Sequence, residues 1–166
     1  MRNVRNLALL LAVSMMATMV VAQAAQQGPM FGAWKLNLAK SNFGTGTKLG
    51  GMVVQVTSDT AALVKWTTTM TAANGMQFSY SFEGAADGKD HAAQGTATTY
   101  AYSVDGNVVK ETQKDSDGTL TVGTFAVAPN GKAGTWTYTI TDPQGNVVNQ
   151  TLVFDRVAAT QTASMN

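Results

Sequence analysis

Hydrophobic and polar residues alternate through most of the chain. The clearest run extends from Met76 to Gly84, where apolar or aromatic residues occupy the even-numbered positions up to Phe82 and polar residues lie between them. Residues 132–141 repeat the pattern, with Trp136 and Tyr138 on one face. Because successive side chains of a strand point to opposite faces, this period of two predicts half-buried antiparallel strands. No comparable run has the 3.6-residue period of a long helix, so the pattern predicts an all-β protein.

Turn signals divide the chain into segments of about eight to twelve residues, a spacing typical of sandwiches and barrels. Asn-Gly, Asp-Gly and proline-containing sequences favour tight turns, because they supply positive φ angles or a fixed bend. The clearest expected strands cover residues 61–71, 76–84, 96–104, 108–114, 119–128, 132–141 and 147–156. Weaker strand signals lie at residues 34–38, 52–58 and 90–93.

The links between these expected strands are short, which favours antiparallel pairing of sequential neighbours in an up-and-down meander. Closing such a meander removes its two exposed edges, which would otherwise promote aggregation. The pattern therefore predicts a closed antiparallel barrel of about eight to ten strands. A two-sheet sandwich is the alternative, since strand spacing alone does not separate the two architectures.

The first residues have the layout of a secretory signal peptide. Arg2 and Arg5 precede an apolar run from Leu7 to Val21, and Ala22-Gln23-Ala24 follows with small residues at the positions that determine cleavage. The run is shorter than the ~20 apolar residues of a spanning helix. We therefore expect a signal peptide at residues 1–24 and export to the periplasm or the medium.

The composition of the chain excludes several kinds of chemistry and several kinds of partner. The chain has no cysteine, so disulfides, a cysteine nucleophile and a cysteine-linked lipid anchor are excluded. Loss of Arg2 and Arg5 with the signal peptide would leave nine of the eleven basic residues against ten acidic ones, scattered singly along the chain. With neither a basic stripe nor a basic amphipathic helix, we expect no nucleic-acid partner and no membrane anchor after cleavage.

Two features together resemble the lipocalin superfamily. Gly32-Ala33-Trp34 matches the Gly-x-Trp motif near the mature N-terminus of that superfamily, and Arg156 lies at the end of the last long strand, where the superfamily places an arginine. The resemblance implies a lipocalin-like barrel in which Arg156 packs across the ring of Trp34 and closes one end. Such a contact would be a cation–π interaction.

A closer resemblance covers almost the whole mature chain. Residues 32–43, GAWKLNLAKSNF, resemble the opening of a family of small exported bacterial proteins with a lipocalin-like domain. Residues 87–91 and the turn at 142–147 are also similar to that family. The resemblance implies the fold and export, but it supplies no catalytic residues.

His91, the single histidine, is the one candidate for metal binding or acid–base chemistry. Asp87 and Asp90 lie near it in sequence, but one histidine among the acids of a turn is a poor metal site, and a solvated turn is the simpler interpretation. No nucleophile elbow or phosphate-binding loop is present. We therefore predict no catalytic residue, metal or cofactor, and an enzyme centred on His91 is the least favoured hypothesis.

Aromatic residues on the apolar strand faces provide the candidate ligand site. Four of them are tyrosines, and a dry core would avoid their hydroxyl groups, each of which needs a partner. An eight-stranded barrel is just wide enough to be filled by side chains or to hold one small ligand. The predicted ligand-binding residues are Phe78, Tyr80, Tyr100, Tyr102, Trp136 and Tyr138.

These observations predict a barrel domain at residues 25–157 followed by a disordered tail at residues 158–166. The favoured hypothesis is an exported, non-enzymatic protein that binds a small apolar or amphipathic molecule inside the barrel. The alternative is a structural or interaction protein of the cell envelope, with a filled barrel and no ligand. The two hypotheses differ in whether the barrel contains a connected apolar cavity.

Overall fold

The computed structural model describes residues 27–158, which contain ten strands and no helix. The strands are β1 (Gly32–Leu36), β2 (Leu49–Asp59), β3 (Val64–Ala72), β4 (Gln77–Gly84), β5 (His91–Ala92), β6 (Thr99–Asp105), β7 (Val108–Lys114), β8 (Leu120–Val127), β9 (Ala133–Thr141) and β10 (Val147–Val157). The predicted signal peptide and residues 159–166 of the predicted tail lie outside the described residues. Within residues 27–158, no helix is long and apolar enough to cross a membrane.

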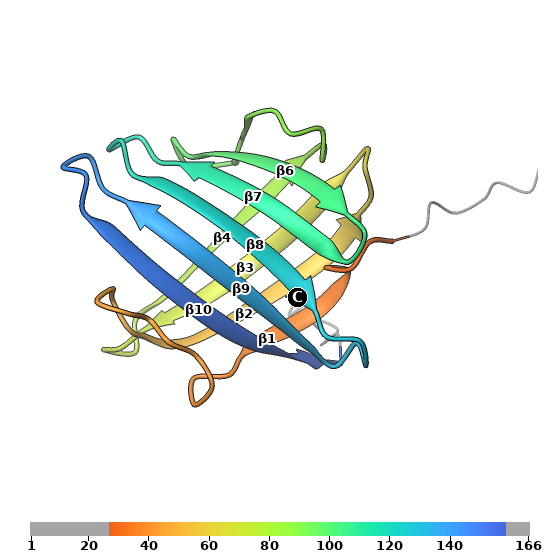
Figure 1. Ribbon diagram of the computed structural model, residues 1–166, viewed down its shortest axis with the longest axis horizontal. Coiled ribbons are helices and arrows are strands. Elements are labelled where there is room, and N and C mark those ends of the chain that lie inside the picture. Colours follow the sequence, from red (N-terminus) through yellow and green to blue (C-terminus); the bar gives the residue numbers. More distant parts are fainter. Residues whose placement is uncertain (1–26, 159–166) are drawn as a thin grey trace, which may run out of the picture.

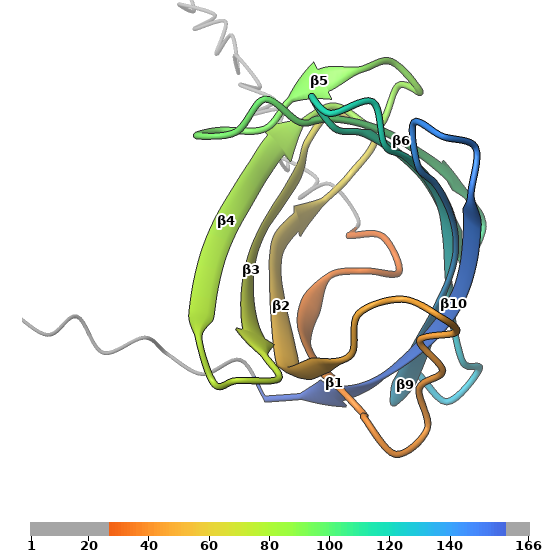
Figure 2. The same ribbon diagram turned by 90° about the vertical axis from the view of Figure 1, so that its left-hand side faces the viewer.

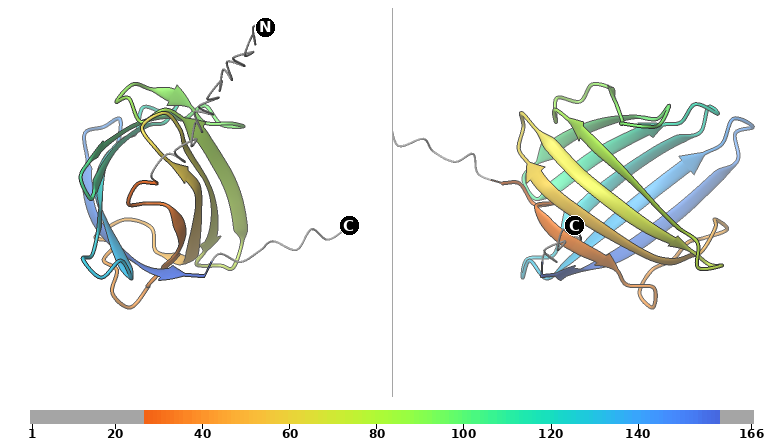
Figure 3. Two further views of the ribbon diagram at one scale, coloured as in Figure 1. Left: turned by 90° about the vertical axis from the view of Figure 1, so that its right-hand side faces the viewer. Right: turned by 180° about the vertical axis from the view of Figure 1, so that it is seen from behind.

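All ten strands belong to one antiparallel sheet that curves into a barrel (Figure 1). The strand order is β4-β3-β2-β1-β10-β9-β8-β7-β6-β5, so β1, the first strand, pairs with β2 on one side and with the last strand, β10, on the other. Figure 2 looks into the resulting ring, and the right panel of Figure 3 shows the slant of the strands on the side opposite to that seen in Figure 1. The predicted all-β meander barrel is confirmed, and the sandwich alternative is wrong because there is one sheet rather than two.

The seam of the barrel lies between β4 and the β5–β6 hairpin. A single bridge pairs Ser81 with Gln94, and the amide of Gly88 donates a hydrogen bond of 2.8 Å to the carbonyl of Tyr102. These bonds connect the two ends of the sheet without a continuous ladder. The seam is therefore the least extensively hydrogen-bonded junction in the described barrel.

Some strand boundaries differ from those predicted. β3 begins at Val64 rather than at residue 61, because Thr60 and Leu63 exchange backbone hydrogen bonds in a tight turn. β2 starts earlier than expected, at Leu49, and Gly50 and Gly51 at its start carried no strand signal. β6 begins at Thr99, three residues later than predicted.

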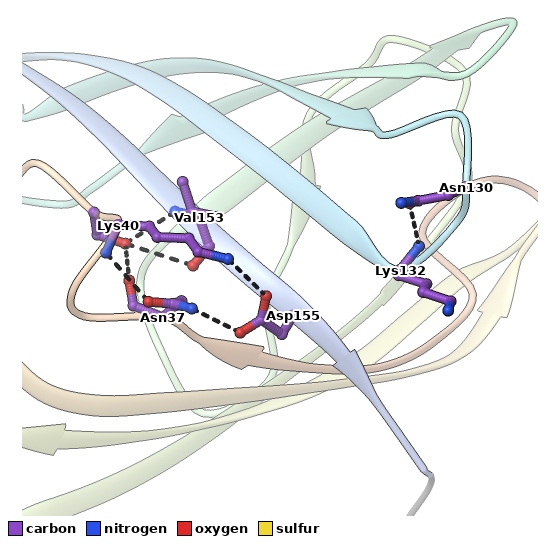
Figure 4. A network of polar contacts seen from close by, with 7 residues as sticks. Asn37, Lys40, Asn130, Lys132, Val153 and Asp155 are labelled. Atoms are coloured by element: carbon purple, nitrogen blue, oxygen red, sulfur yellow. Dashed lines mark hydrogen bonds and ion pairs between the residues drawn. The ribbon is translucent and has the colours of Figure 1, made fainter.

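The segment that follows β1 is held against β10 (Figure 4). The side-chain amide of Asn37 donates a hydrogen bond of 2.7 Å to Asp155, and the Nζ of Lys40 lies 3.9 Å from the same carboxylate. The hydroxyl of Ser41 accepts a bond of 2.9 Å from the amide of Val153. Asn37, Lys40 and Ser41 all belong to the sequence run that carries the closer family resemblance. Their contacts give that run a structural role, which is to attach the loop to the last strand.

A short segment before β1, residues 27–31, enters one end of the barrel and is called the N-terminal plug here (Figures 2 and 3). Met30 is 4% exposed, its carbonyl accepts a hydrogen bond from the indole of Trp34, and its amide donates one of 2.7 Å to Asp59. Asp59 is fully buried at the end of β2. The plug is therefore fixed from both sides and closes this end of the barrel.

Two glycines on inward faces make room for aromatic rings. A Cβ on Gly123 would overlap the ring of Tyr138, its direct partner on the neighbouring strand. A Cβ on Gly134 would likewise overlap the ring of Phe125. Because these positions carry no side chain, each ring can lie flat across the adjacent strand. The two rings form part of the wall of a cavity inside the barrel.

Candidate functional site

The barrel encloses a cavity of about 70 Å³. Its walls are mostly aromatic and aliphatic, and its polar lining side chains besides the tyrosines are Thr68, Glu111 and Gln113. One water molecule needs roughly 10–15 Å³ of such volume. The cavity can thus hold a few waters or a small organic group, and the interior is neither packed solid nor wide open.

Five of the six predicted ligand-binding residues line this cavity: Tyr80, Tyr100, Tyr102, Trp136 and Tyr138. They come from β4 and β6, which flank the seam, and from β9, which lies five strands away from β4 in the order of the sheet. The structure therefore brings together residues far apart in sequence, as the alternation indicated. Whether they bind a ligand remains a prediction.

Phe78 does not line the cavity, and its placement there was wrong. It shares a face of β4 with Tyr80 and Phe82, but it is 42% exposed near the start of the strand, whereas Phe82 is 1% exposed. Alternation identifies the face of a strand but not the depth of a residue along the barrel axis. Met76, expected on the same face, precedes β4 and is 59% exposed.

The cavity wall contains a buried carboxylic acid that the sequence interpretation missed. Glu111 is 6% exposed, and its Oε2 accepts a hydrogen bond of 2.6 Å from the hydroxyl of Tyr102. That hydroxyl in turn accepts a bond of 3.1 Å from the indole nitrogen of Trp66. The three side chains form a continuous hydrogen-bonded chain from β3 through β6 to β7.

Burial is the largest influence on the pKa of Glu111. Loss of hydration raises its pKa from 4.5 to about 7, and the hydrogen bond from Tyr102 offsets this only in part. Oε1 of the same carboxyl has no hydrogen-bond partner among residues 27–158 and is not sealed from the cavity. The group is therefore poised between its neutral and charged forms near pH 7, with one oxygen free to accept a hydrogen bond.

The sequence contained a pattern from which an inward-facing Glu111 could have been predicted. Val109, Glu111 and Gln113 alternate on one face of β7, and Val109 is fully buried. The register of the hairpin also places Glu111 directly opposite Tyr102. Assigning the inward face of β7 from Val109 would have placed a carboxylate among the aromatic residues.

The tyrosines of the cavity are hydrogen-bond donors rather than nucleophiles. Burial raises the pKa of Tyr80 to about 12 and that of Tyr100 further, and the negative charge of Glu111 acts in the same direction on both. The pKa of Tyr138 is also raised by burial, and its hydroxyl has no hydrogen-bond partner in the described part of the chain. All three hydroxyls keep their protons at neutral pH.

Among the residues that the structure describes, no basic side chain lines the cavity. Lysine, arginine and histidine are absent from its lining, although the described surface carries ion pairs such as Lys65–Glu83 and Lys114–Asp90, each with an N–O distance of 2.6 Å. Glu111 is thus the one ionisable group other than tyrosine in the lining. The electrostatic character of the cavity is acidic.

Trp34 and Arg156 lie at the plugged end of the barrel. The guanidinium carbon of Arg156 is 4.1 Å from the centre of the Trp34 ring, and the two residues are direct partners on β1 and β10. The guanidinium also donates hydrogen bonds to the carbonyls of Phe31, Pro29 and Gly131. Arg156 therefore connects the plug, the β8–β9 turn and the last strand.

His91 lies outside the cavity. Its Nε2 is 2.8 Å from Asp87 on a half-exposed turn, and this hydrogen bond is the main cause that lowers the pKa of Asp87. No group of three or more potential metal ligands occurs within the residues that the structure describes. The geometry gives His91 a local role in fixing its turn.

No protein-family model matches the chain, and no curated protein sequence matches it as a relative. Solved structures do resemble it. A secretory abundant heat soluble (SAHS) protein from Ramazzottius varieornatus aligns with a TM-score of 0.54 and 12% identity, over 80% of this chain and 98% of that one. A point mutant of the fluorescent protein UnaG aligns with a TM-score of 0.50 and 13% identity, over 78% and 97% of the two chains. These similarities show the barrel fold alone.

Proposed function

We propose that this protein binds one small molecule, mainly apolar and with a polar group, inside its barrel. The observation that carries the proposal is the cavity itself, whose lining includes Glu111 and Tyr138. Within residues 27–158, Oε1 of Glu111 and the hydroxyl of Tyr138 have no hydrogen-bond partner. Polar atoms inside a barrel are costly unless they find a hydrogen-bond partner. A few convergent polar groups in an apolar pocket are typical of small-molecule sites.

The size of the cavity restricts the ligand. An engineered apolar cavity of about 150 Å³ holds benzene, and the cavity here is about half that volume. A molecule of about four non-hydrogen atoms can enter without side-chain movement, given that each water-sized position takes roughly 10–15 Å³. Larger ligands require rotation of a lining side chain such as Met52, which has a flexible side chain.

Export is part of the proposal. The basic start, apolar run and small residues of the first 24 positions support a cleaved signal peptide, and the resemblance to exported lipocalin-like proteins agrees with it. A protein with this role would meet its ligand in the periplasm or the medium. The absence of cysteine suits an oxidising compartment, because no thiol can be oxidised there.

One observation favours the alternative of a barrel without a ligand. The aromatic side chains pack closely, with Trp34–Phe125 and Trp136–Tyr138 ring centres each 5.1 Å apart. If ordered waters satisfy Glu111 and Tyr138, the cavity is simply hydrated core. The two functions then differ in whether an organic molecule displaces those waters.

Native mass spectrometry of the protein purified from its own host tests the proposal, together with an NMR titration using propan-2-ol. We expect either a retained small molecule or saturable chemical-shift changes confined to residues that line the cavity, including Trp136 and Tyr138. A bare protein mass, together with no saturable change on addition of propan-2-ol, would contradict ligand binding and favour the structural role.

A further inference from the structure

The polar side of the cavity is arranged for a hydrogen-bond donor. Tyr102 fixes one oxygen of Glu111 at 2.6 Å, whereas Oε1 has no hydrogen-bond partner among residues 27–158, and the described lining of the cavity contains no basic side chain to neutralise it. Trp66 holds the Tyr102 hydroxyl in place through its indole N–H, at 3.1 Å. The carboxyl group is therefore pre-positioned before any ligand arrives.

We infer that the ligand carries a protonated amine, so that the cavity selects a small alkylammonium ion whose N–H group donates to Oε1 of Glu111 while its alkyl carbons contact the aromatic rings. This inference rests on the proposed function, since it specifies the chemistry of the molecule that the cavity holds. It assigns Glu111 as the residue that determines specificity.

The aromatic walls support a cation. Trp66 packs edge-on against Tyr80 and Tyr100, with ring centres 5.5 and 5.4 Å apart, and Trp136 stacks on Tyr138. Organic cations are attracted to the faces of such rings, and aromatic cages are a common way to bind alkylated ammonium groups. A carboxylate beside aromatic faces combines this attraction with a charge-assisted hydrogen bond.

The same arrangement disfavours an anion. A carboxylate ligand would lie near Glu111 without an arginine, lysine or histidine in the lining to balance the two charges. Burial of two like charges is strongly unfavourable unless one of them takes up a proton. The cavity should therefore bind an anion far more weakly than a cation of the same size.

Binding of an ammonium ion should depend on the ionisation of Glu111. The titratable groups around this carboxyl are phenols: Tyr102 and Tyr100 from β6, Tyr138 from β9 and Tyr80 from β4. All of them stay protonated below pH 9, because burial raises their pKa values. Only Glu111 then changes charge between pH 6 and 8, and a pKa of about 7 gives about a tenfold increase in its ionised fraction.

Three probes of about four non-hydrogen atoms separate charge from size: isopropylammonium, propan-2-ol and acetate. NMR titrations should give an affinity for isopropylammonium at least about tenfold higher than that for propan-2-ol at pH 8, with about a tenfold loss at pH 6 and no comparable loss for propan-2-ol. Acetate should not bind. An alkylamine stays protonated over this range, so the pH dependence reports on the protein.

Glu111→Gln provides the matched variant, since the amide oxygen can still accept the Tyr102 hydrogen bond. This variant should lose the preference for isopropylammonium over propan-2-ol together with its pH dependence. Tyr102→Phe provides a second test. This substitution removes the hydrogen bond that lowers the pKa of Glu111, so the midpoint of isopropylammonium binding should move to higher pH.

The outcomes distinguish the two proposals. Equal affinity for propan-2-ol and isopropylammonium, or a preference that survives Glu111→Gln with the fold intact, would overturn the alkylammonium inference and leave the binding function standing. Failure of all three probes to produce saturable shifts at lining residues would overturn both. A preference for acetate would also overturn the alkylammonium inference, because it would require a cavity that favours negative charge.

Discussion

The hydroxyl of Tyr102 lies 2.6 Å from Oε2 of Glu111, and the two residues are direct partners across the β6–β7 hairpin. Both side chains are nearly or fully buried, at 1% and 6% exposure. A short hydrogen bond between an ionisable acid and a phenol inside a barrel ties the stability of the hairpin to the protonation state of the acid.

We expect the free energy of unfolding to decrease as the pH rises from about 4.5 to about 7 because of Glu111. Its pKa is raised to about 7 in the folded protein, so in this window the folded state keeps a proton that the unfolded state has released. The loss should total roughly 3 kcal/mol and level off above pH 7. Urea unfolding at a series of pH values measures it.

Glu111→Gln is the control, because the difference between the two proteins isolates this one group. The surface carboxyls Asp87, Asp117 and Asp142, whose pKa values are lowered, act in the opposite direction at lower pH and cancel in the difference. A difference that stays constant between pH 4.5 and 7 would mean that Glu111 titrates as an ordinary exposed acid.

Trp34→Ala should destabilise the fold by ~3–5 kcal/mol, since the ring is 2% exposed and packs edge-on against Phe125 at 5.1 Å. Arg156→Ala should cost less, about 1–2 kcal/mol, because the guanidinium is exposed although it contacts the ring and three carbonyls. Chemical denaturation of both single variants and the double variant should reveal a coupling of about 0.5–1 kcal/mol. Purely additive losses would mean that the cation–π contact contributes nothing measurable.

Gly123→Ala should alter the cavity through Tyr138. The new methyl group would overlap the Tyr138 ring, which must then tilt into the free volume. We expect a destabilisation of about 1–3 kcal/mol and weaker binding of propan-2-ol, measured by denaturation and NMR titration. Gly51→Ala, where a Cβ has only ordinary contacts with Thr71, is the matched control and should leave binding unchanged.

Gly28→Ala should loosen the N-terminal plug. A Cβ at this position would lie 2.5 Å from Oδ2 of Asp59, the atom that accepts the amide hydrogen bond of Met30. Hydrogen exchange of the Met30 amide should therefore accelerate, while amides in the middle of β9 keep their protection. Unchanged exchange at Met30 would indicate that Asp59 holds the plug without needing the space beside Gly28.

The sequence was sufficient to predict which face of each strand points into the barrel. It was not sufficient to predict how deep a residue lies along the barrel or which residue it contacts. Alternation correctly placed Tyr80 and Tyr138 on inward faces, because a period of two is a local property of any strand. It could not reveal that Phe78 lies beyond the cavity, since depth depends on the stagger of neighbouring strands. Glu111 was overlooked because a charged residue in a strand is ordinarily assigned to the solvent face.

Asp59 is a second residue whose burial and contacts could not be predicted from the sequence. In the sequence it marks a turn after a strand, and the structure buries it completely beneath the plug, where burial raises its pKa and Oδ1 has no partner among the described residues. The partner that makes this burial tolerable, the amide of Met30, is 29 residues away. Contacts of this kind depend on how the barrel closes, which no local pattern encodes.

The position of β1 between β2 and β10 has a consequence for the order of folding. Every other extended strand pair joins neighbours in sequence, so those hairpins can form as soon as both of their strands exist. β1 obtains its second partner only when residues 154–157 are available, because Leu36 pairs with Phe154 and Ala33 with Val157. Closing that loop of more than a hundred residues carries an entropic cost that the local hairpins do not. A nascent chain that has emerged only as far as β9 thus lacks the strand that completes the ring, and the barrel can close only near the end of synthesis.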